Sequence, residues 1–242
     1  AEGLDQTVKL PSRTEAYIER LQAAVNAQPG AAAAYPDIAG MMARVHGRLE
    51  AEPMPLMIPG ADGARPFLLQ RRDLQQMTSG LIADPASAAI ALAMYAEIDQ
   101  AGSANIASAI IARFYELGAP ISLQPMSTAM DLASGISAER LAQVEHEAQT
   151  ALLGAYLNFP MPQLNGVWDG FGLDDDFRAA PTGETPILLL SGTLDGRTYP
   201  DSQRAALSRM AHVDWVIVEN AGHNLFMTTP EVPAVMHRFM VG

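Results

Sequence analysis

Two segments near the C-terminus each place a reactive side chain just after a run of apolar residues. Asp195 follows such a run in "LLLSGTLDGRTYP" at 188–200, and His223 follows another in "VIVENAGHNLF" at 216–226. A carboxylate that accepts a hydrogen bond from an imidazole N–H fixes the tautomer of the ring and stabilises its protonated form. Because that pairing activates hydroxyl nucleophiles, the sequence predicts Asp–His acid–base chemistry.

The competing interpretations of these residues are structural. An Asp after a strand is commonly a turn or capping residue, and a Gly-His pair by itself is common. The other His and Asp residues are less well placed: His212 and Asp214 stand at the start of the second apolar run, and His146 lies between two Glu residues on a polar helix face. The combination of an acid and a His, each after its own strand, favours the catalytic interpretation.

The elements that must position this pair are two strands separated by a helix. Apolar runs at 186–192 and 213–218 alternate with helical patterns at 201–211 and 231–240, which gives the order βαβα. Strands that are apolar on both faces are typical of a parallel sheet covered on both sides. The carboxyl ends of parallel strands meet at one edge of the sheet, so both side chains are expected there.

The rest of the chain has helical periodicity. Apolar residues recur at helical spacing from 12 to about 159, and we predict this part to be nearly all helix. Ser12 and Glu15 stand at the spacing of a capping box, which predicts a helix start.

Two further helices are expected in this region. Asp84 and Pro85 predict an N-cap and first turn, and this helix should bury Ile90, Met94 and Ile98. Another should run over 137–153.

The chain thus divides near residue 184 into two predicted units of an α/β fold. Residues 1–184 form a mostly helical cap with a connector rich in Pro, Gly and Asp at 158–184, and residues 185–242 form the βαβα piece. About three strands or more are needed for a stable sheet. The two strands are therefore expected to pair with strands outside this piece.

Composition excludes several functions. The 242 residues carry 15 basic and 27 acidic side chains, a net charge of −12 that disfavours nucleic acid and anionic membranes as partners. There is no Cys, no His pair at metal-ligand spacing and no phosphate loop, so we expect neither metal nor cofactor. The absence of a long apolar run predicts a soluble protein; a cytoplasmic location is expected, with secretion left open by the first residue, Ala1.

The segments "TPILLLSGTLDGRTYP" and "WVIVENAGHNLF" resemble the acid and histidine segments of α/β-hydrolases, in particular the proline iminopeptidase and tripeptidyl aminopeptidase-like branch. The resemblance covers about residues 185 to 242. It implies that Asp195 is the triad acid, that His223 is the general base, and that the helical region corresponds to the cap, or lid, of this branch. It also implies a small peptide or ester as the substrate.

A nucleophile elbow is missing. No Ser has Gly at both the second position before it and the second position after it, as the G-x-S-x-G elbow requires. The stretch "EGLDQTVKLPS" resembles the segment through which this branch leaves its core for the cap, just after the strand that succeeds the elbow. We therefore expect the nucleophile and the first half of the core to lie upstream of Ala1, and this chain alone to be inactive.

The resemblance also bears on substrate binding. Aminopeptidases of this branch hold the substrate ammonium group with acids of the cap, and the corresponding segment here is "TAMD", in which Asp131 is the candidate ligand and Met130 replaces an acid. The structural alternative for Asp131 is a capping or solvated position on a helix.

A second function class stays open. The cap and half-core could form a non-catalytic binding or assembly module that completes its sheet with another polypeptide. In either case the unpaired edge of the first strand is a template for pairing, and we expect self-association through it or partial mobility of the βαβα piece.

Overall fold

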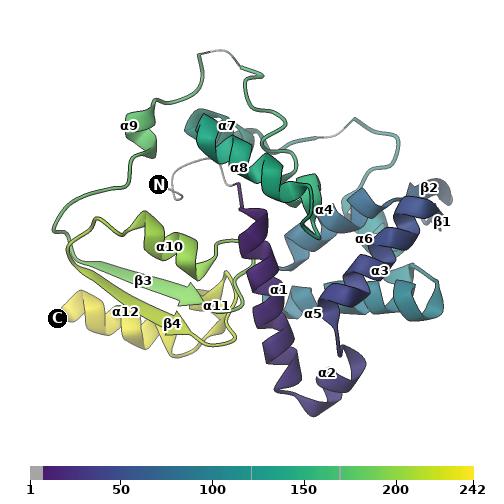
Figure 1. The fold of residues 1–242 in the computed structure, drawn as a ribbon, viewed down its shortest axis with the longest axis horizontal. Helices are drawn as coiled ribbons and strands as arrows, with labels where there is room; N and C mark the ends of the chain where they lie inside the picture. The colour runs from purple at the N-terminus through teal and green to yellow at the C-terminus, as the bar shows by residue number, and fades with distance from the viewer. Residues whose placement is uncertain (1–7, 121, 169) are drawn as a thin grey trace.

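The computed structural model describes residues 8–120, 122–168 and 170–242 (Figure 1), so most of the stretch "EGLDQTVKLPS" lies outside the described residues. The first part of the chain contains α1 (Pro11–Asn26), α2 (Pro29–Ala34), α3 (Ile38–Ala51), β1 (Met54–Ile58), β2 (Arg65–Leu69), α4 (Arg71–Leu81), α5 (Pro85–Ala96), η1 (Glu97–Ala101) and α6 (Asn105–Phe114). The second part contains α7 (Pro125–Ser134), α8 (Ala138–Ala148), η2 (Gly154–Asn158), α9 (Asp175–Arg178), β3 (Ile187–Gly192), α10 (Pro200–Ala206), β4 (Val213–Val218), α11 (Leu225–Thr228) and α12 (Val232–Val241).

The fold mixes helices with two small sheets, which agrees with the coarse α/β prediction. The first sheet is an antiparallel hairpin of β1 and β2, with Met54 opposite Leu69 and Ile58 opposite Arg65. The prediction that this region is nearly all helix was wrong here. Each strand is only five residues long and buries a single side chain fully, Ile58 or Leu69, so its period-2 pattern was too short to recognise.

The main core lies among α1, α3, α4 and α5. Tyr17, Ile38, Leu74 and Met94 are fully buried there, and η1 continues α5 with its Ile98 buried. The expectation for Met94 and Ile98 is thus confirmed. Ile90 was assigned to the wrong face: it is 45% exposed. α5 is apolar nearly all round, so its pattern could not identify its buried face, which is formed by Ala88, Ala91, Leu92, Met94 and Tyr95.

The predicted capping box at the start of α1 is not formed. The helix begins at Pro11, one residue earlier, which suits a residue without a backbone N–H. The backbone N–H of Ser12 donates to the carboxylate of Glu147 in α8 at 2.9 Å, and the carboxylate of Glu15 accepts from the N–H of Leu152 at 2.9 Å. These two residues therefore join α1 to α8 and to the turn after α8.

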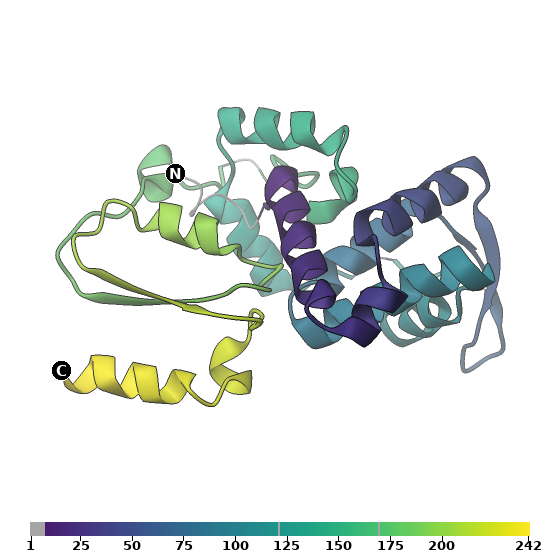
Figure 2. The same ribbon diagram turned by 60° about the horizontal axis from the view of Figure 1, so that its bottom comes forward.

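The C-terminal piece has the predicted βαβα order. β3 and β4 pair in parallel, with Leu190 opposite Val216, and Figures 1 and 2 show α10 and α12 on opposite faces of the pair. The indole N–H of Trp215 in β4 donates to Ser191 in β3 at 2.8 Å, and Ser191 in turn donates to Gln203 in α10 at 2.6 Å. The strands and α10 are thus tied through buried polar groups as well as by the sheet.

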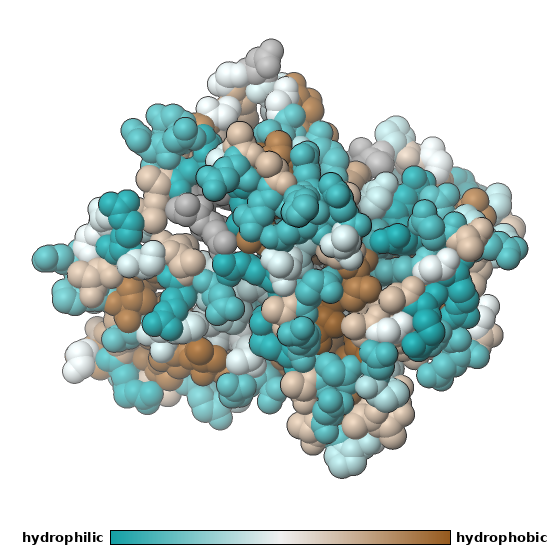
Figure 3. Space-filling model, viewed as in Figure 1, coloured by the Kyte–Doolittle hydropathy of each residue, from teal (hydrophilic) through white to brown (hydrophobic). Residues whose placement is uncertain are grey.

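This piece leaves considerable apolar surface uncovered. Among the described residues its sheet has two strands, and Ile187 to Leu190 of β3 are only half-buried. Phe226, Met227 and Met240 are 57%, 73% and 80% exposed. Figure 3 shows hydrophobic residues gathered over β4 and α12. In the described ranges, none of the helices combines the length and the apolar character needed to span a membrane.

His46 is a buried titratable group in the helical core. Its Nε2 lies 2.7 Å from the hydroxyl of Tyr95, and the residue is 4% exposed. Burial lowers the pKa of His46 to about 4, with a smaller contribution from the positive charge of Arg71. The folded protein therefore holds His46 neutral at a pH where the unfolded chain binds a proton.

This difference predicts acid sensitivity. Between pH 6.5 and 4 the unfolded state binds the extra proton, so the free energy of unfolding should fall as the pH drops through this window, by up to about 3 kcal/mol from His46. We expect His46→Gln to reduce that slope and exposed His237→Gln to leave it unchanged, measured by urea unfolding at several pH values. Equal slopes in all three proteins would contradict this role of His46.

Candidate functional site

The predicted contact between Asp195 and His223 is present. His223 Nδ1 lies 3.1 Å from Asp195 Oδ2. The Asp side chain is 2% exposed, whereas the His side chain is 33% exposed. The two loops meet because they come directly after neighbouring parallel strands, β3 and β4, and so emerge at the same edge of the sheet. The pair therefore has a buried acid and an imidazole that reaches the surface.

The loop after β3 holds the carboxylate of Asp195 in place. Its Oδ1 accepts hydrogen bonds from the backbone N–H groups of Arg197 and Thr198, each at 2.8 Å. Both donors fix the orientation of the carboxylate group. Since Oδ2 then accepts from His223 Nδ1–H, the other ring nitrogen, Nε2, has its lone pair available. Nε2 makes no hydrogen bond within the described ranges, and this is the atom that a general base would use.

Both loops dock on the junction between α4 and α5. The N–H of Gly196 donates to the carbonyl of Ile82 at 3.1 Å, and the N–H of His223 donates to that of Ala83 at 2.9 Å. Gly196 allows this approach, because a Cβ there would overlap the Ile82 carbonyl. The relative position of the acid and the His is therefore fixed by the helical region as well as by the sheet.

Asp84 has a different role from the one expected. α5 does begin at Pro85 as predicted, but the Asp84 side chain makes no capping hydrogen bond. Its carboxylate accepts from the backbone N–H of Asn224 at 3.1 Å and from the Asn224 side-chain amide at 2.9 Å. Asp84 thus anchors the residue after the candidate base, a role that local sequence could not show because the two residues are far apart in the chain.

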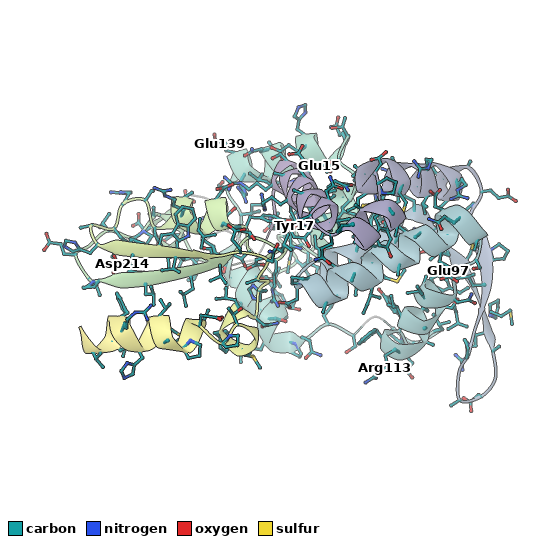
Figure 4. The ribbon with its side chains drawn as sticks, turned by 90° about the horizontal axis from the view of Figure 1, so that it is seen from below. Glu15, Tyr17, Glu97, Arg113, Glu139 and Asp214 are labelled. Atoms are coloured by element: carbon teal, nitrogen blue, oxygen red, sulfur yellow. The ribbon has the colours of Figure 1, made fainter. Side chains whose placement is uncertain are left out.

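α1 supports the loop after β3 from another side. The guanidinium of Arg20 donates to the carbonyl of Thr193 at 3.1 Å, and the hydroxyls of Thr14 and Tyr199 lie 2.6 Å apart. Figure 4 shows Tyr17 of α1 where the helices meet the sheet, and Asp214 at the far end of β4. This placement agrees with the expectation that Asp214 lies at the opposite end of the strands from the candidate site.

A cavity of about 890 Å³ lies beside the same loop, and we call it the Lys9 cavity. Arg197, Thr198 and Tyr199 form part of its wall, and Asp131, the predicted ammonium ligand, lies in the wall as well. His223 is not among the lining residues. The structure therefore brings Asp131 to the cavity but does not bring it to the Asp195–His223 pair.

Lys9 is a feature of the cavity that sequence reasoning missed. Its ammonium group donates to the carbonyl of Ser79 at 3.2 Å and to the Ser79 hydroxyl at 3.1 Å, while its backbone N–H and C=O both bond to the side chain of Asn158. The pKa of Lys9 is lowered to about 8, first by burial and then by the positive charge of Arg197, against an opposing effect of Asp195. The available signal was that Lys9 is the only lysine in the chain.

No serine of the described ranges hydrogen-bonds to His223. Ser79 lies near the end of α4 with its hydroxyl donating to the carbonyl of Leu157 at 2.5 Å, and Ser191 is held between the strands and α10. Within the part of the chain that the structure describes, His223 is thus bonded to Asp195 and to no serine hydroxyl.

The described residues include no group of three or more His, Cys, Asp or Glu side chains arranged to hold a metal ion. Comparisons of the chain with models of known protein families, with curated proteins and with solved structures gave no match. The function of the chain must consequently be inferred from the geometry of the site.

The docking of the acid loop can be tested at Gly196. We expect Gly196→Ala to lower the free energy of unfolding by about 1–3 kcal/mol, because its Cβ would overlap the Ile82 carbonyl. The matched control is Gly47→Ala within α3, where a Cβ meets no atom within 4 Å and should stabilise the helix by about 0.5–1 kcal/mol. Urea unfolding compares the two; a Gly196→Ala protein as stable as wild type would exclude this close docking.

Proposed function

We propose that this chain supplies the acid and the general base of a serine-type hydrolase of the α/β-hydrolase kind, with its nucleophile provided by polypeptide outside the described residues. The observation that carries the proposal is the contact of His223 with a buried Asp195 whose other oxygen is held by two backbone N–H groups. This arrangement supports proton transfer at Nε2 of His223.

In the proposed reaction Nδ1 of His223 stays bound to Asp195 and Nε2 transfers the proton. Nε2 of His223 takes the proton of a serine hydroxyl as its oxygen attacks the substrate carbonyl, and the Asp195 carboxylate stabilises the resulting imidazolium. The same proton then passes to the leaving amine or alcohol as the acyl–enzyme forms. In the second half, His223 removes a proton from water, the water oxygen attacks the acyl group, and the proton returns to the serine oxygen.

The unfinished sheet supports an external source of the nucleophile. In the described ranges β3 pairs with β4 alone and its residues are only half-buried, whereas about three strands or more are needed for a stable sheet. A further strand on the free edge of β3 would emerge at the same end as Asp195. A nucleophile carried after that strand would lie next to the pair.

The proposed substrate class is a small peptide or ester, with an aminopeptidase-like reaction as the specific form. Asp131 supports this through its position in the wall of the Lys9 cavity, where a carboxylate could receive an ammonium group. The helical region, by resemblance the lid of this branch, would then shape the substrate site.

A non-catalytic binding or assembly module is the second candidate. The exposed apolar side chains of the C-terminal piece favour it, among them Phe226, Met227 and Met240, because contiguous apolar surface commonly marks an interface. Intact mass spectrometry of the natural protein separates the two: a longer polypeptide supports the hydrolase, and a natural chain of 242 residues supports the module. Sedimentation velocity then reports whether the chain self-associates.

The first activity test uses the 242-residue chain itself. We expect no hydrolysis of p-nitrophenyl esters or aminoacyl-p-nitroanilides above background, and no labelling by a fluorophosphonate probe, because no serine of the described ranges is hydrogen-bonded to His223. Stoichiometric labelling of Ser79, which lies beside Lys9, would instead place a nucleophile within the chain and overturn the proposed external source.

The second test uses the natural polypeptide that contains this sequence. We expect His223→Ala to lower kcat by several orders of magnitude and Asp195→Asn to lower it by about 10⁴, as in serine proteases that lose the acid. His237→Ala, on the exposed face of α12, is the control and should retain full activity. Wild-type turnover of His223→Ala would rule out the assignment of the base.

A further inference from the structure

The Lys9 cavity gathers positive charge beside an apolar surface. Lys9 and Arg197 both line it, and Arg140 contributes a third cationic side chain from α8. The apolar part of the wall includes Met77, Leu81, Ile110, Phe159 and Leu189. A ligand that satisfies both parts of the wall has an anionic head and an apolar body.

The positive charges of Lys9 and Arg197 repel each other. Protein atoms closely surround the ammonium group of Lys9, while part of the residue faces the cavity and remains accessible. The charge of Arg197 is near enough to lower the pKa of Lys9. Two like charges that line one cavity repel, and an anion bound near both would offset that repulsion.

The charges of the surroundings indicate how much negative charge the ligand carries. Asp131 lies in the wall of the cavity. Asp195 does not line the cavity, but its negative charge is close enough to raise the pKa of Lys9. Their two negative charges leave a net charge of about +1 against the three cations. A singly charged anion therefore matches the site better than a dianion such as a phosphate monoester.

We infer that the Lys9 cavity is a binding site for an amphiphilic monocarboxylate, with the carboxylate held between Lys9 and Arg197 and the apolar body against the wall formed by α4, α6 and β3. This site goes beyond the proposed hydrolytic function, since it requires neither His223 nor a nucleophile. The walls come from helices far apart in the sequence and line an open cavity of about 890 Å³, which accommodates an acid of medium chain length.

The test exploits Lys9 as the only lysine of the chain. Protein labelled with ¹³C-lysine gives one lysine signal, and its titration reports the pKa of Lys9, which starts at about 8. Hexanoate at saturation should raise this pKa to about 9 or above, because a ligand that prefers the charged lysine tenfold shifts it by that amount. Hexanamide, with the same apolar body and no charge, should leave the titration unchanged.

Other titratable groups around the cavity could contribute to the titration of Lys9. Besides Asp131, Arg140, Arg197 and nearby Asp195, the titratable residues that line the cavity are Tyr115, Tyr156 and Tyr199. Burial raises the pKa of Tyr115 and Tyr199, so these two tyrosines stay neutral through the range in which Lys9 titrates.

We expect Arg197→Gln to weaken hexanoate binding about tenfold or more, the usual loss when a charge-assisted hydrogen bond is removed. It should also raise the pKa of Lys9 in the free protein. Lys9→Met should weaken binding similarly and remove the dependence of affinity on pH near 8. Arg238→Gln removes the same charge from the exposed face of α12, away from the cavity, and should bind like wild type.

The outcomes separate this proposal from the hydrolytic one. A lysine signal that hexanoate does not move, or that hexanamide moves equally, overturns the carboxylate site, as does equal affinity of Arg197→Gln and Arg238→Gln. Arg197 is exposed, so its variant should fold and provides the answer even where Lys9→Met fails to fold. None of these measurements involves turnover, and a failure of the hydrolase proposal leaves them unaffected.

Discussion

The junction between α4 and α5 is the constraint on which the candidate site depends. Carbonyl groups of Ile82 and Ala83 accept from the loops after β3 and β4, and the Asp84 carboxylate accepts twice from Asn224. A two-stranded sheet is marginal by itself and cannot set the geometry of two loops to a few tenths of an ångström. The 3.1 Å contact between Asp195 and His223 is therefore held by a helical scaffold far away in the sequence.

The C-terminal piece is tied to the helical region at one end of its strands and leaves apolar surface exposed along them. At the carboxyl end of its strands, hydrogen bonds to α1 and to the α4–α5 junction satisfy the backbone. Along the strands, the residues of β3 are only half-buried and Ile217 of β4 is 44% exposed. The Asp195–His223 pair is thus well ordered although apolar surface lies exposed beside it. Exposed apolar surface of this kind commonly marks a place where another polypeptide packs.

Sequence reasoning succeeded where the signal was local or came from the geometry of parallel strands. It placed β3, β4 and the start of α10 within one residue, although α10 ends at Ala206, before the predicted 211. It also brought Asp195 to His223, because strand-end loops of one sheet edge must meet. It failed at Ser12, where the helix begins one residue earlier and the backbone N–H donates to Glu147. It also failed at Asp84, whose carboxylate accepts from Asn224, because a cap is only one of the partners available to such a side chain. The hairpin of β1 and β2 was too short to recognise, and the importance of Lys9 depends on burial, which composition does not reveal.

The loop after β3 lies between the Asp195–His223 pair and the Lys9 cavity. On one side Asp195 orients His223 and accepts from the backbone of Arg197 and Thr198; on the other side the same two residues form part of the wall of the Lys9 cavity. A ligand that draws Arg197 toward a carboxylate acts on the peptide segment whose N–H groups hold the Asp195 carboxylate. The proposed ligand binding in the cavity and the proposed proton transfer at His223 would therefore share one short segment of backbone, so that the hydrogen bonds of Asp195 offer a direct route for coupling between them.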